Sequence, residues 1–178
     1  CGGNNLPCLT SFGTDSTLDI ITWNIEHFPK NYYTLDKVKS IINQLNVDII
    51  ALQEIQNEFY FNELIQSLDN YDGFRSNENN VGLNLAYIYK SNIQVDTIRD
   101  ISGLNIDDFG RNPLLMKFEW ADENIFLINN HFKCCDYYEE RIASVQALKS
   151  YIDDSLYNSN VIVLGDLNDK IEEPDSNN

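Results

Sequence analysis

Apolar residues in this chain fall into short runs, and the spacing inside each run predicts a strand or a helix. Unbroken or alternating apolar runs of strand length cover residues 18–24, 47–52, 84–90, 114–120, 125–130 and 161–164. Apolar residues at helical spacing predict a helix from Tyr33 or Thr34, one over 57–68 and one over 138–157, in which Ile142, Val145, Leu148 and Ile152 repeat every three or four residues. The polar residues 99–113 should form a loop. This order of elements indicates an α/β sandwich with helices outside.

Polar side chains stand at the ends of four of the expected strands. Asn24 ends the run LDIITWN, Glu54 ends VDIIALQE, His131 ends IFLINNH, and Asp166 with Asn168 ends NVIVLGDLN. Because ligands of α/β proteins gather beyond the carboxyl ends of strands, we expect these side chains to meet in one crevice. Two carboxylates, two carboxamides and an imidazole suit a hard divalent cation and acid–base chemistry on a phosphate ester.

In this order the four segments resemble the motifs of the endonuclease/exonuclease/phosphatase superfamily, which includes deoxyribonuclease I, abasic-site endonucleases, sphingomyelinases and inositol-phosphate phosphatases. The resemblance runs from about Asp19 to Asp169, and Arg111-Asn112-Pro113 fits the family's Arg-x-Pro element. It implies a deoxyribonuclease I-like, four-layer α/β sandwich, in which helices flank a β-sandwich. Residues 1–17, rich in Gly, Asn, Ser and Thr, are expected to be a flexible leader, and residues 18–178 the family domain.

The family pattern also contains a further Asp and a closing Ser-Asp-His-like motif downstream of its Asp-x-Asn segment. Here ten residues follow Asn168, and the two histidines of the chain are His27 and His131. We therefore expect the sequence to cover about two-thirds of a family domain, without its C-terminal strands. A complementing C-terminal fragment or second chain is then an expected partner, and an inactive remnant with a binding role is one alternative function.

Glu54 is the expected metal ligand, together with Asn24. Glu54 directly ends a run that should be buried, where a carboxylate needs a cation or dense hydrogen bonding to stay charged. The alternative is a solvated loop residue. Asn24 stands in the same place after the first strand and would orient a phosphate oxygen or a metal-bound water. The expected ion is Mg²⁺ or Mn²⁺, which keeps several waters, and Ca²⁺ stays open as a structural ion.

Four residues are the expected catalytic and substrate-binding groups. Asp166 would orient or deprotonate the attacking water, and Asn168 would hydrogen-bond a phosphate oxygen, although a strand-ending turn also uses Gly, Asp and Asn. His131 would be a general acid or a phosphate stabiliser, because an imidazole titrates near neutrality; the alternative is a structural histidine. Arg111 would clamp the substrate by bidentate hydrogen bonds, or else be a plain surface arginine. His27 is expected to be a loop or packing residue.

Charge leaves the substrate open. The net charge of −16, from 28 acidic and 12 basic residues, argues against nucleic acid, which usually meets a basic face. A bound divalent ion can reverse the local field, so metal-dependent cleavage of nucleic acid stays the first hypothesis. The alternative is a hydrolase of phospholipid head groups, inositol phosphates or other small phosphate esters.

The four cysteines indicate an exported protein. Cys1 followed by Gly-Gly-Asn-Asn resembles the mature start of a bacterial lipoprotein, whose first cysteine carries the lipid anchor; an arbitrary start or a Cys1–Cys8 disulfide is the alternative. Cys134 and Cys135 are adjacent, and a disulfide between them would be strained, whereas free thiols survive poorly outside the cell. The expected location is therefore secreted, periplasmic or on the outer surface of a bacterium.

Overall fold

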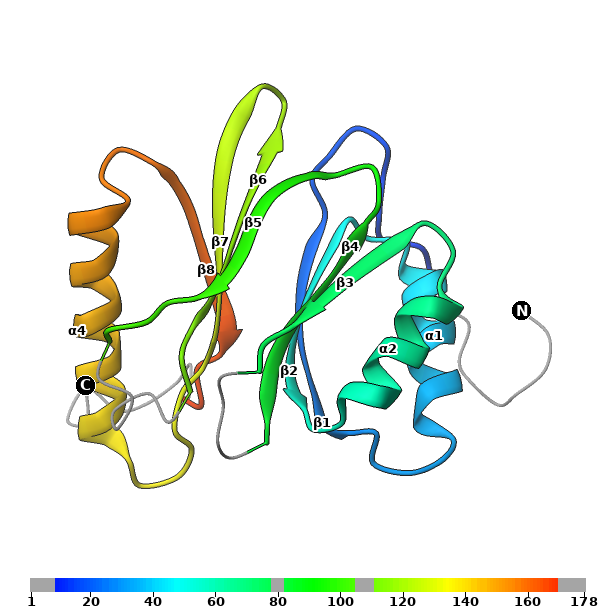
Figure 1. Ribbon diagram of the computed structural model, residues 1–178, viewed down its shortest axis with the longest axis horizontal. Helices are drawn as coiled ribbons and strands as arrows, with labels where there is room; N and C mark the ends of the chain where they lie inside the picture. Colours follow the sequence, from blue (N-terminus) through cyan, green and yellow to red (C-terminus); the bar gives the residue numbers. More distant parts are fainter. Residues whose placement is uncertain (1–8, 78–81, 105–110, 170–178) are drawn as a thin grey trace.

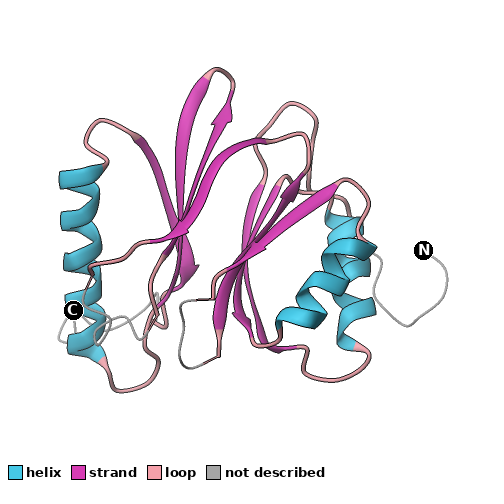
Figure 2. Cartoon of the chain, viewed as in Figure 1, coloured by secondary structure: helices cyan, strands magenta, loops and turns pink. Residues whose placement is uncertain are grey.

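The computed structural model describes residues 9–77, 82–104 and 111–169 and arranges them in four layers (Figure 1). Helices α1 (Thr34–Leu45) and α2 (Glu58–Ser67) cover the outer face of one sheet, and α4 (Tyr138–Ser155) covers the outer face of the other (Figure 2). The two sheets face each other between these helices. This is the expected α/β sandwich of the deoxyribonuclease I type.

The first sheet has the strand order β1-β2-β4-β3 and the second β5-β6-β7-β8. Each sheet contains one parallel pair that a helix connects, β1 and β2 through α1 and β7 and β8 through α4, whereas the other pairs are antiparallel. The bounds are β1 Ile20–Phe28, β2 Ile49–Ile55, β3 Tyr71–Arg75, β4 Asn84–Lys90, β5 Gln94–Asp100, β6 Leu114–Trp120, β7 Glu123–His131 and β8 Asn160–Asp166.

Three apolar clusters hold the layers together. One lies between the first sheet and its helices, one between the two sheets, and one between the second sheet and α4. Alternate residues of β2 belong to two of these clusters. Ile50 and Leu52 pack against the helices, whereas Ile49 and Ala51 pack against the other sheet. Burial on both faces explains why β2 reads as an unbroken apolar run in the sequence.

The apolar pattern of the sequence predicts neither β3 nor β5 as a strand. Both are edge strands, and β5 includes Arg99 and Asp100 of the expected loop 99–113. Polar residues make up most of YDGFR and QVDTIRD, so these two segments give a weak apolar pattern. An irregularity between Val95 and Thr97 also interrupts the alternation in β5.

Helix α4 packs on the sheet with only part of its apolar repeat. Leu148 and Ile152 contact the core, whereas Val145 is 54% exposed. Arg141 and Ser144 are buried beside Leu148. Arg141 is buried because its guanidinium donates to the Cys135 carbonyl and lies beside Asp169. Polar hydrogen bonding decides the orientation of this helix as much as apolar spacing does.

Part of the expected leader packs on the fold. The backbone N–H groups of Phe12 and Gly13 both donate to the Leu45 carbonyl at the end of α1, over 3.0 Å. Residues 1–8 lie outside the described residues, as do residues 170–178. Within the described segments, no helix is both long enough and apolar enough to cross a membrane.

Candidate active site

The ends of the two parallel strand pairs meet where the sheets approach each other. His131 and Asp166 are direct neighbours in the β7–β8 register. On the facing sheet, the regular pairing of β1 with β2 ends at Asn24, which lies opposite Gln53, and Glu54 directly follows Gln53. Asn24 Nδ2 donates to Glu54 Oε1 over 3.0 Å and to Asp166 Oδ2 over 2.8 Å. One carboxamide thus connects the carboxylates of both sheets, and the expected crevice at the strand ends is formed.

Irregularities in β1 and β2 aim Glu54 into this crevice. The β1–β2 pairing shifts between Asn24 and Phe28, and the β2–β4 pairing shifts between Leu52 and Ile55. Glu54 has a φ of 65° and His27 a φ of 54°, both in the left-handed region. Bulges commonly re-aim side chains beside active sites, and left-handed non-glycine residues cluster there. The His27 N–H donates to Glu54 Oε2 over 3.1 Å, which fixes the carboxylate.

The turn after β8 holds Asp166 and Asn168 rigidly. The Asn168 N–H donates to Asp166 Oδ1 over 3.0 Å, and Asn168 Nδ2 donates to the Phe132 carbonyl over 2.8 Å. Gly165 precedes them at a φ of 138°, and a Cβ there would lie 2.1 Å from the Asn130 carbonyl oxygen. Glycine is therefore required for β8 to approach β7 closely enough to place Asp166.

His131 lies between the two carboxylates and is almost fully buried, at 5% exposed. Its Nε2 is 3.8 Å from Glu54 Oε1 and 3.8 Å from Asp166 Oδ2. Burial, followed by the charge of Arg111, lowers the pKa of His131 to about 4, and the opposing effect of the carboxylates is smaller. From the sequence we expect the His131 imidazole to titrate near pH 7. In the folded protein it is uncharged at pH 7, because desolvation disfavours its charged form.

Arg111 lies beside His131 and lines the same cavity. Its Nη1 donates to the His131 carbonyl over 3.2 Å, and burial lowers the pKa of its guanidinium. The buried Nε of Arg111 has no hydrogen-bond partner among the described residues. A half-buried arginine with an unused donor beside a cavity is typical of sites that bind a carboxylate or a phosphate.

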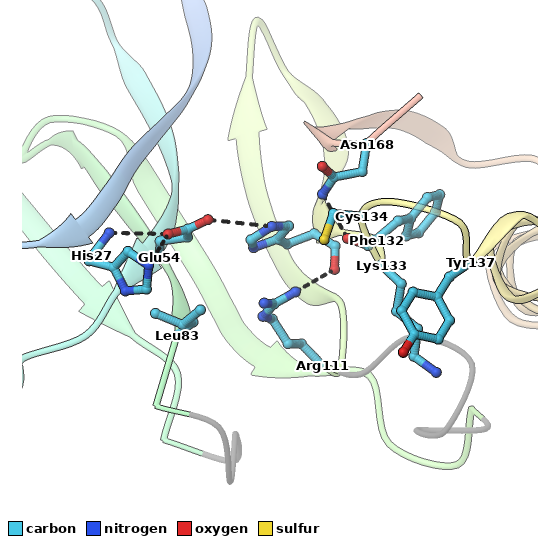
Figure 3. A pocket seen from close by; sticks show the side chains of 10 residues that line it. His27, Glu54, Leu83, Arg111, Phe132, Lys133, Cys134, Tyr137 and Asn168 are labelled. Carbon is cyan, nitrogen blue, oxygen red and sulfur yellow. Dashed lines mark hydrogen bonds and ion pairs between the residues drawn. The ribbon is translucent and has the colours of Figure 1, made fainter. Parts of the chain in front are cut away.

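A cavity of about 480 Å³ opens over these residues (Figure 3). Glu54 and His27 approach it from the first sheet, and Asn168 from the end of the second (Figure 3). His131 of β7 also lines it. Lys133 and Tyr137 stand at its far side, where the Lys133 Nζ lies 5.4 Å from the centre of the Tyr137 ring. The cavity is lined by His27, Glu54, Leu83, Arg111, His131, Phe132, Lys133, Cys134, Tyr137 and Asn168.

The oxygen-rich end of the site fits a hard divalent cation that keeps most of its waters. Across residues 9–77, 82–104 and 111–169, no group of three or more His, Cys, Asp or Glu side chains is arranged around one point. Mg²⁺ and Mn²⁺ need only one or two carboxylates, and Glu54 and Asp166 both point at the Asn24 amide. The Nε2 atoms of His27 and His131 lie 3.7 and 3.8 Å from the Glu54 carboxylate, and because His131 is neutral the charge of Glu54 is only partly compensated.

Asn24 is positioned differently from an oxygen ligand. Its Oδ1 accepts the Glu26 N–H over 2.9 Å, so its NH₂ group faces the two carboxylates. Ligation of a cation by Asn24 therefore requires the carboxamide to turn. The role of Asn24 as a metal ligand stays a prediction.

Sequence reasoning did not find His27, Lys133 and Tyr137 as parts of the site. His27 follows Asn24 by three residues, and its role depends on the irregularity in β1, which apolar spacing does not reveal. Lys133 and Tyr137 lie on the segment between β7 and α4, where the sequence carries no motif. Proximity to His131 along the chain is the one signal that points to them.

Cys134 and Cys135 are free thiols, with 2.7 Å between their Sγ atoms. Cys1 and Cys8, the other expected disulfide partners, lie outside the described residues.

The comparisons with known proteins agree with this arrangement. The model of the endonuclease/exonuclease/phosphatase family matches residues 21–178. Zebrafish (D. rerio) TDP2 complexed with a single-strand DNA product is 20% identical with a TM-score of 0.72, over 88% of this chain and 62% of that chain. The human Nocturnin catalytic domain with bound sulfate is 18% identical with a TM-score of 0.68, over 86% and 65%. A family protein from Leptotrichia buccalis is 16% identical with a TM-score of 0.66, over 85% and 67%.

Comparison with curated protein sequences gives no match. The chain spans less than two thirds of the TDP2 and Nocturnin chains that it matches. At these low sequence identities, the structural similarity shows a shared fold and no more. The family model, by contrast, covers nearly the whole chain. Together with the site residues at the four strand ends, it shows that this chain belongs to the endonuclease/exonuclease/phosphatase family.

Proposed function

We propose that this protein hydrolyses phosphodiesters with the help of a divalent cation, and that its substrate is nucleic acid. The observation that carries the proposal is the charge of the cavity. The whole chain has 28 acidic and 12 basic residues, yet the charged side chains that line the cavity are two cations, Arg111 and Lys133, and one carboxylate, Glu54. Basic side chains gathered in an acidic protein fit an anionic ligand.

In this proposal Glu54 holds Mg²⁺ or Mn²⁺, with Asp166 beside it. When bound, the cation supplies charge stabilisation for a phosphate oxygen. Arg111, with its unused Nε donor, and Lys133 orient the phosphate by hydrogen bonds and charge. Substrate positioning is thus assigned to the side of the cavity opposite Glu54.

Asp166 is the group that orients and deprotonates the attacking water. The Asn24 amide and the Asn168 N–H hold its two carboxylate oxygens, so the carboxylate has a fixed direction. His131 is neutral at pH 7, since its pKa is lowered to about 4. A neutral imidazole donates one hydrogen bond, which favours phosphate stabilisation over general acid catalysis for His131.

Two features favour nucleic acid as the substrate class. Tyr137 is an exposed aromatic ring at the cavity and Lys133 lies over it, a combination that suits stacking of a base beside a bound phosphate. The structure of D. rerio TDP2, which shares this fold, contains a single-strand DNA product. We therefore expect single-stranded nucleic acid to be cleaved faster than duplex.

The second candidate substrate is a phospholipid head group, an inositol phosphate or another small phosphate ester. The observation that favours it is the net charge of −16, which repels a long polyanion away from the cavity. Export with a lipid anchor on Cys1 would bring the site to a membrane surface. Mass spectrometry of Cys1 in protein recovered from its native host tests the anchor.

One substrate panel separates these functions. The protein is incubated with single-stranded DNA, RNA, plasmid DNA, sphingomyelin and inositol phosphates, each with Mg²⁺, Mn²⁺ or chelator, alongside Asp166→Asn and the exposed control Asp154→Asn. We expect metal-dependent cleavage of single-stranded nucleic acid, reduced roughly 10²–10⁴-fold by Asp166→Asn and unchanged by Asp154→Asn. Hydrolysis of lipids or small esters alone favours the second candidate, and cleavage that survives chelation contradicts the metal role.

A further inference from the structure

Two adjacent thiols stand beside the active-site cavity, on the segment that follows β7. Cys134 and Cys135 are free thiols whose Sγ atoms lie 2.7 Å apart, close to the ~2.05 Å of a disulfide bond. Both side chains are exposed, and Cys134 lines the cavity (Figure 3). Cys135 has a φ of 65°, a left-handed backbone conformation that is uncommon for a non-glycine residue.

The segment that carries the thiols also holds the catalytic turn. The Phe132 N–H donates to the Asp166 carbonyl over 2.9 Å, and the Phe132 carbonyl accepts from Asn168 Nδ2 over 2.8 Å. Cys134 is only two residues from Phe132. A shift of the backbone at Cys134 that also moves Phe132 would therefore displace the carbonyl that Asn168 binds.

A second connection runs through α4. Arg141 Nη1 donates to the Cys135 carbonyl over 3.0 Å, and Arg141 Nε lies 3.6 Å from Asp169 Oδ2. Arg141 is buried, so it cannot follow a displaced carbonyl freely. The backbone at Cys135 is thus tied to Asp169, which directly follows Asn168.

We propose that low-molecular-weight disulfides oxidise the Cys134 and Cys135 thiols to an internal disulfide. This oxidation displaces Asn168 and lowers the rate of catalysis. A thiolate of the pair attacks the external disulfide and releases one thiolate of that reagent. The other cysteine, as its thiolate, then attacks the mixed disulfide and releases the second. Two cysteine thiols and one external disulfide are thereby converted into one internal disulfide and two external thiols.

Adjacency makes this pair suited to reversible modification. Consecutive Cα atoms are about 3.8 Å apart, whereas disulfides usually join Cα atoms at roughly 4.4–6.8 Å. A bridge between neighbours is therefore strained, and strained, exposed disulfides are the easily reduced and regulatory ones. Its closure must also change the backbone at Cys135, which Arg141 binds.

Oxidised glutathione tests the inference on a Cys1→Ser/Cys8→Ser protein, in which the remaining cysteines are Cys134 and Cys135. A matched variant adds Cys134→Ser and Cys135→Ser. Peptide mass spectrometry should show the loss of two hydrogen atoms in the peptide that holds both cysteines, restored by dithiothreitol. Hydrogen exchange of residues 166–169 should rise at least ~2-fold on oxidation, as local opening becomes easier, and stay constant in the matched variant.

Cleavage is compared as the ratio of rates before and after oxidation within each protein. We expect a drop of about 10-fold or more in the protein that has both thiols, reversed by dithiothreitol, and a ratio near one in the matched variant. This readout rests on the proposed function, whereas peptide mass and hydrogen exchange do not. Absence of any cleavage before oxidation would count against the proposed function alone. Glutathione adducts without an internal disulfide, or an internal disulfide that leaves hydrogen exchange of 166–169 unchanged, would overturn the inference.

Discussion

Gln53 of β2 and Asn129 of β7 join the two sheets beneath the active site, since Gln53 Nε2 donates to Asn129 Oδ1 over 2.7 Å. Both side chains are buried. Asn129 Nδ2 in turn donates to the Leu52 carbonyl over 2.9 Å and to the Ala86 carbonyl over 3.2 Å. Gln53 directly precedes Glu54, so this hydrogen bond fixes the two sheets relative to each other where they carry the site residues.

Asn129→Leu should destabilise the protein by roughly 2–4 kcal/mol. The substitution removes three buried hydrogen bonds, one from Gln53 Nε2, which still donates to Thr22 Oγ1, and two to the Leu52 and Ala86 carbonyls, and each contributes about 0.5–1.5 kcal/mol. Urea denaturation gives the free energy of unfolding, with the exposed Asn124→Leu on the same strand as the control. A loss of less than ~1 kcal/mol for Asn129→Leu would show that the pair contributes little.

Gly165→Ala should cost roughly 2–4 kcal/mol and lower activity at the same time. A Cβ at this position meets the Asn130 carbonyl oxygen at 2.1 Å, and Asp166 follows directly. Gly103→Ala is the matched control, because Gly103 also has a positive φ, 87°, but no atom within 4 Å of its added Cβ. If both variants lose stability equally, the close approach of β8 to β7 is not what requires glycine at 165.

Tyr71 should make stability fall at alkaline pH. Burial, and secondarily the charge of Asp48, raises the pKa of Tyr71 to about 12, and its hydroxyl donates to the Val47 carbonyl over 2.8 Å. The unfolded chain releases this proton near pH 10, so between pH 10 and 12 the folded state binds more protons and the free energy of unfolding falls as pH rises.

Tyr71→Phe should therefore be less stable than the wild type at pH 8, by about 1 kcal/mol for the lost hydrogen bond, but should lose less stability between pH 10 and 12. Urea denaturation at several pH values measures both effects. The exposed Tyr157→Phe is the control. Parallel pH profiles for wild type and Tyr71→Phe would contradict the raised pKa.

Arg111→Lys should lower kcat/KM for phosphodiester cleavage roughly 10²-fold with little effect on folding, because lysine keeps the charge but lacks the planar donor fork of arginine. Arg99→Lys, on the exposed edge strand β5, serves as the matched control. Steady-state kinetics on a single-stranded oligonucleotide measure the effect. Equal kinetics for Arg111→Lys and wild type would mean that Arg111 acts by charge alone.

The sequence could predict that the candidate site residues lie together because these residues directly follow buried strands. Glu54 and His131 each end an apolar run, and parallel pairing brings such ends together, so burial and topology could be inferred from spacing. The protonation of His131 could not, since its lowered pKa depends on depth of burial and on Arg111, twenty residues away along the chain. His27 could not be assigned because an irregularity in β1 directs it, and no apolar pattern encodes that irregularity.

The metal-dependent active site is tested by cleavage of a single-stranded oligonucleotide as a function of Mg²⁺ concentration, for wild type, Glu54→Gln and the control Glu63→Gln on the exposed face of α2. We expect saturable Mg²⁺ activation of wild type and of Glu63→Gln. Glu54→Gln should lose ~10²-fold or more in rate, and higher Mg²⁺ should partly restore it, because a metal ligand has been weakened. Glu54→Gln activity equal to wild type across the whole Mg²⁺ range would contradict the assignment of this cavity as a metal-dependent active site.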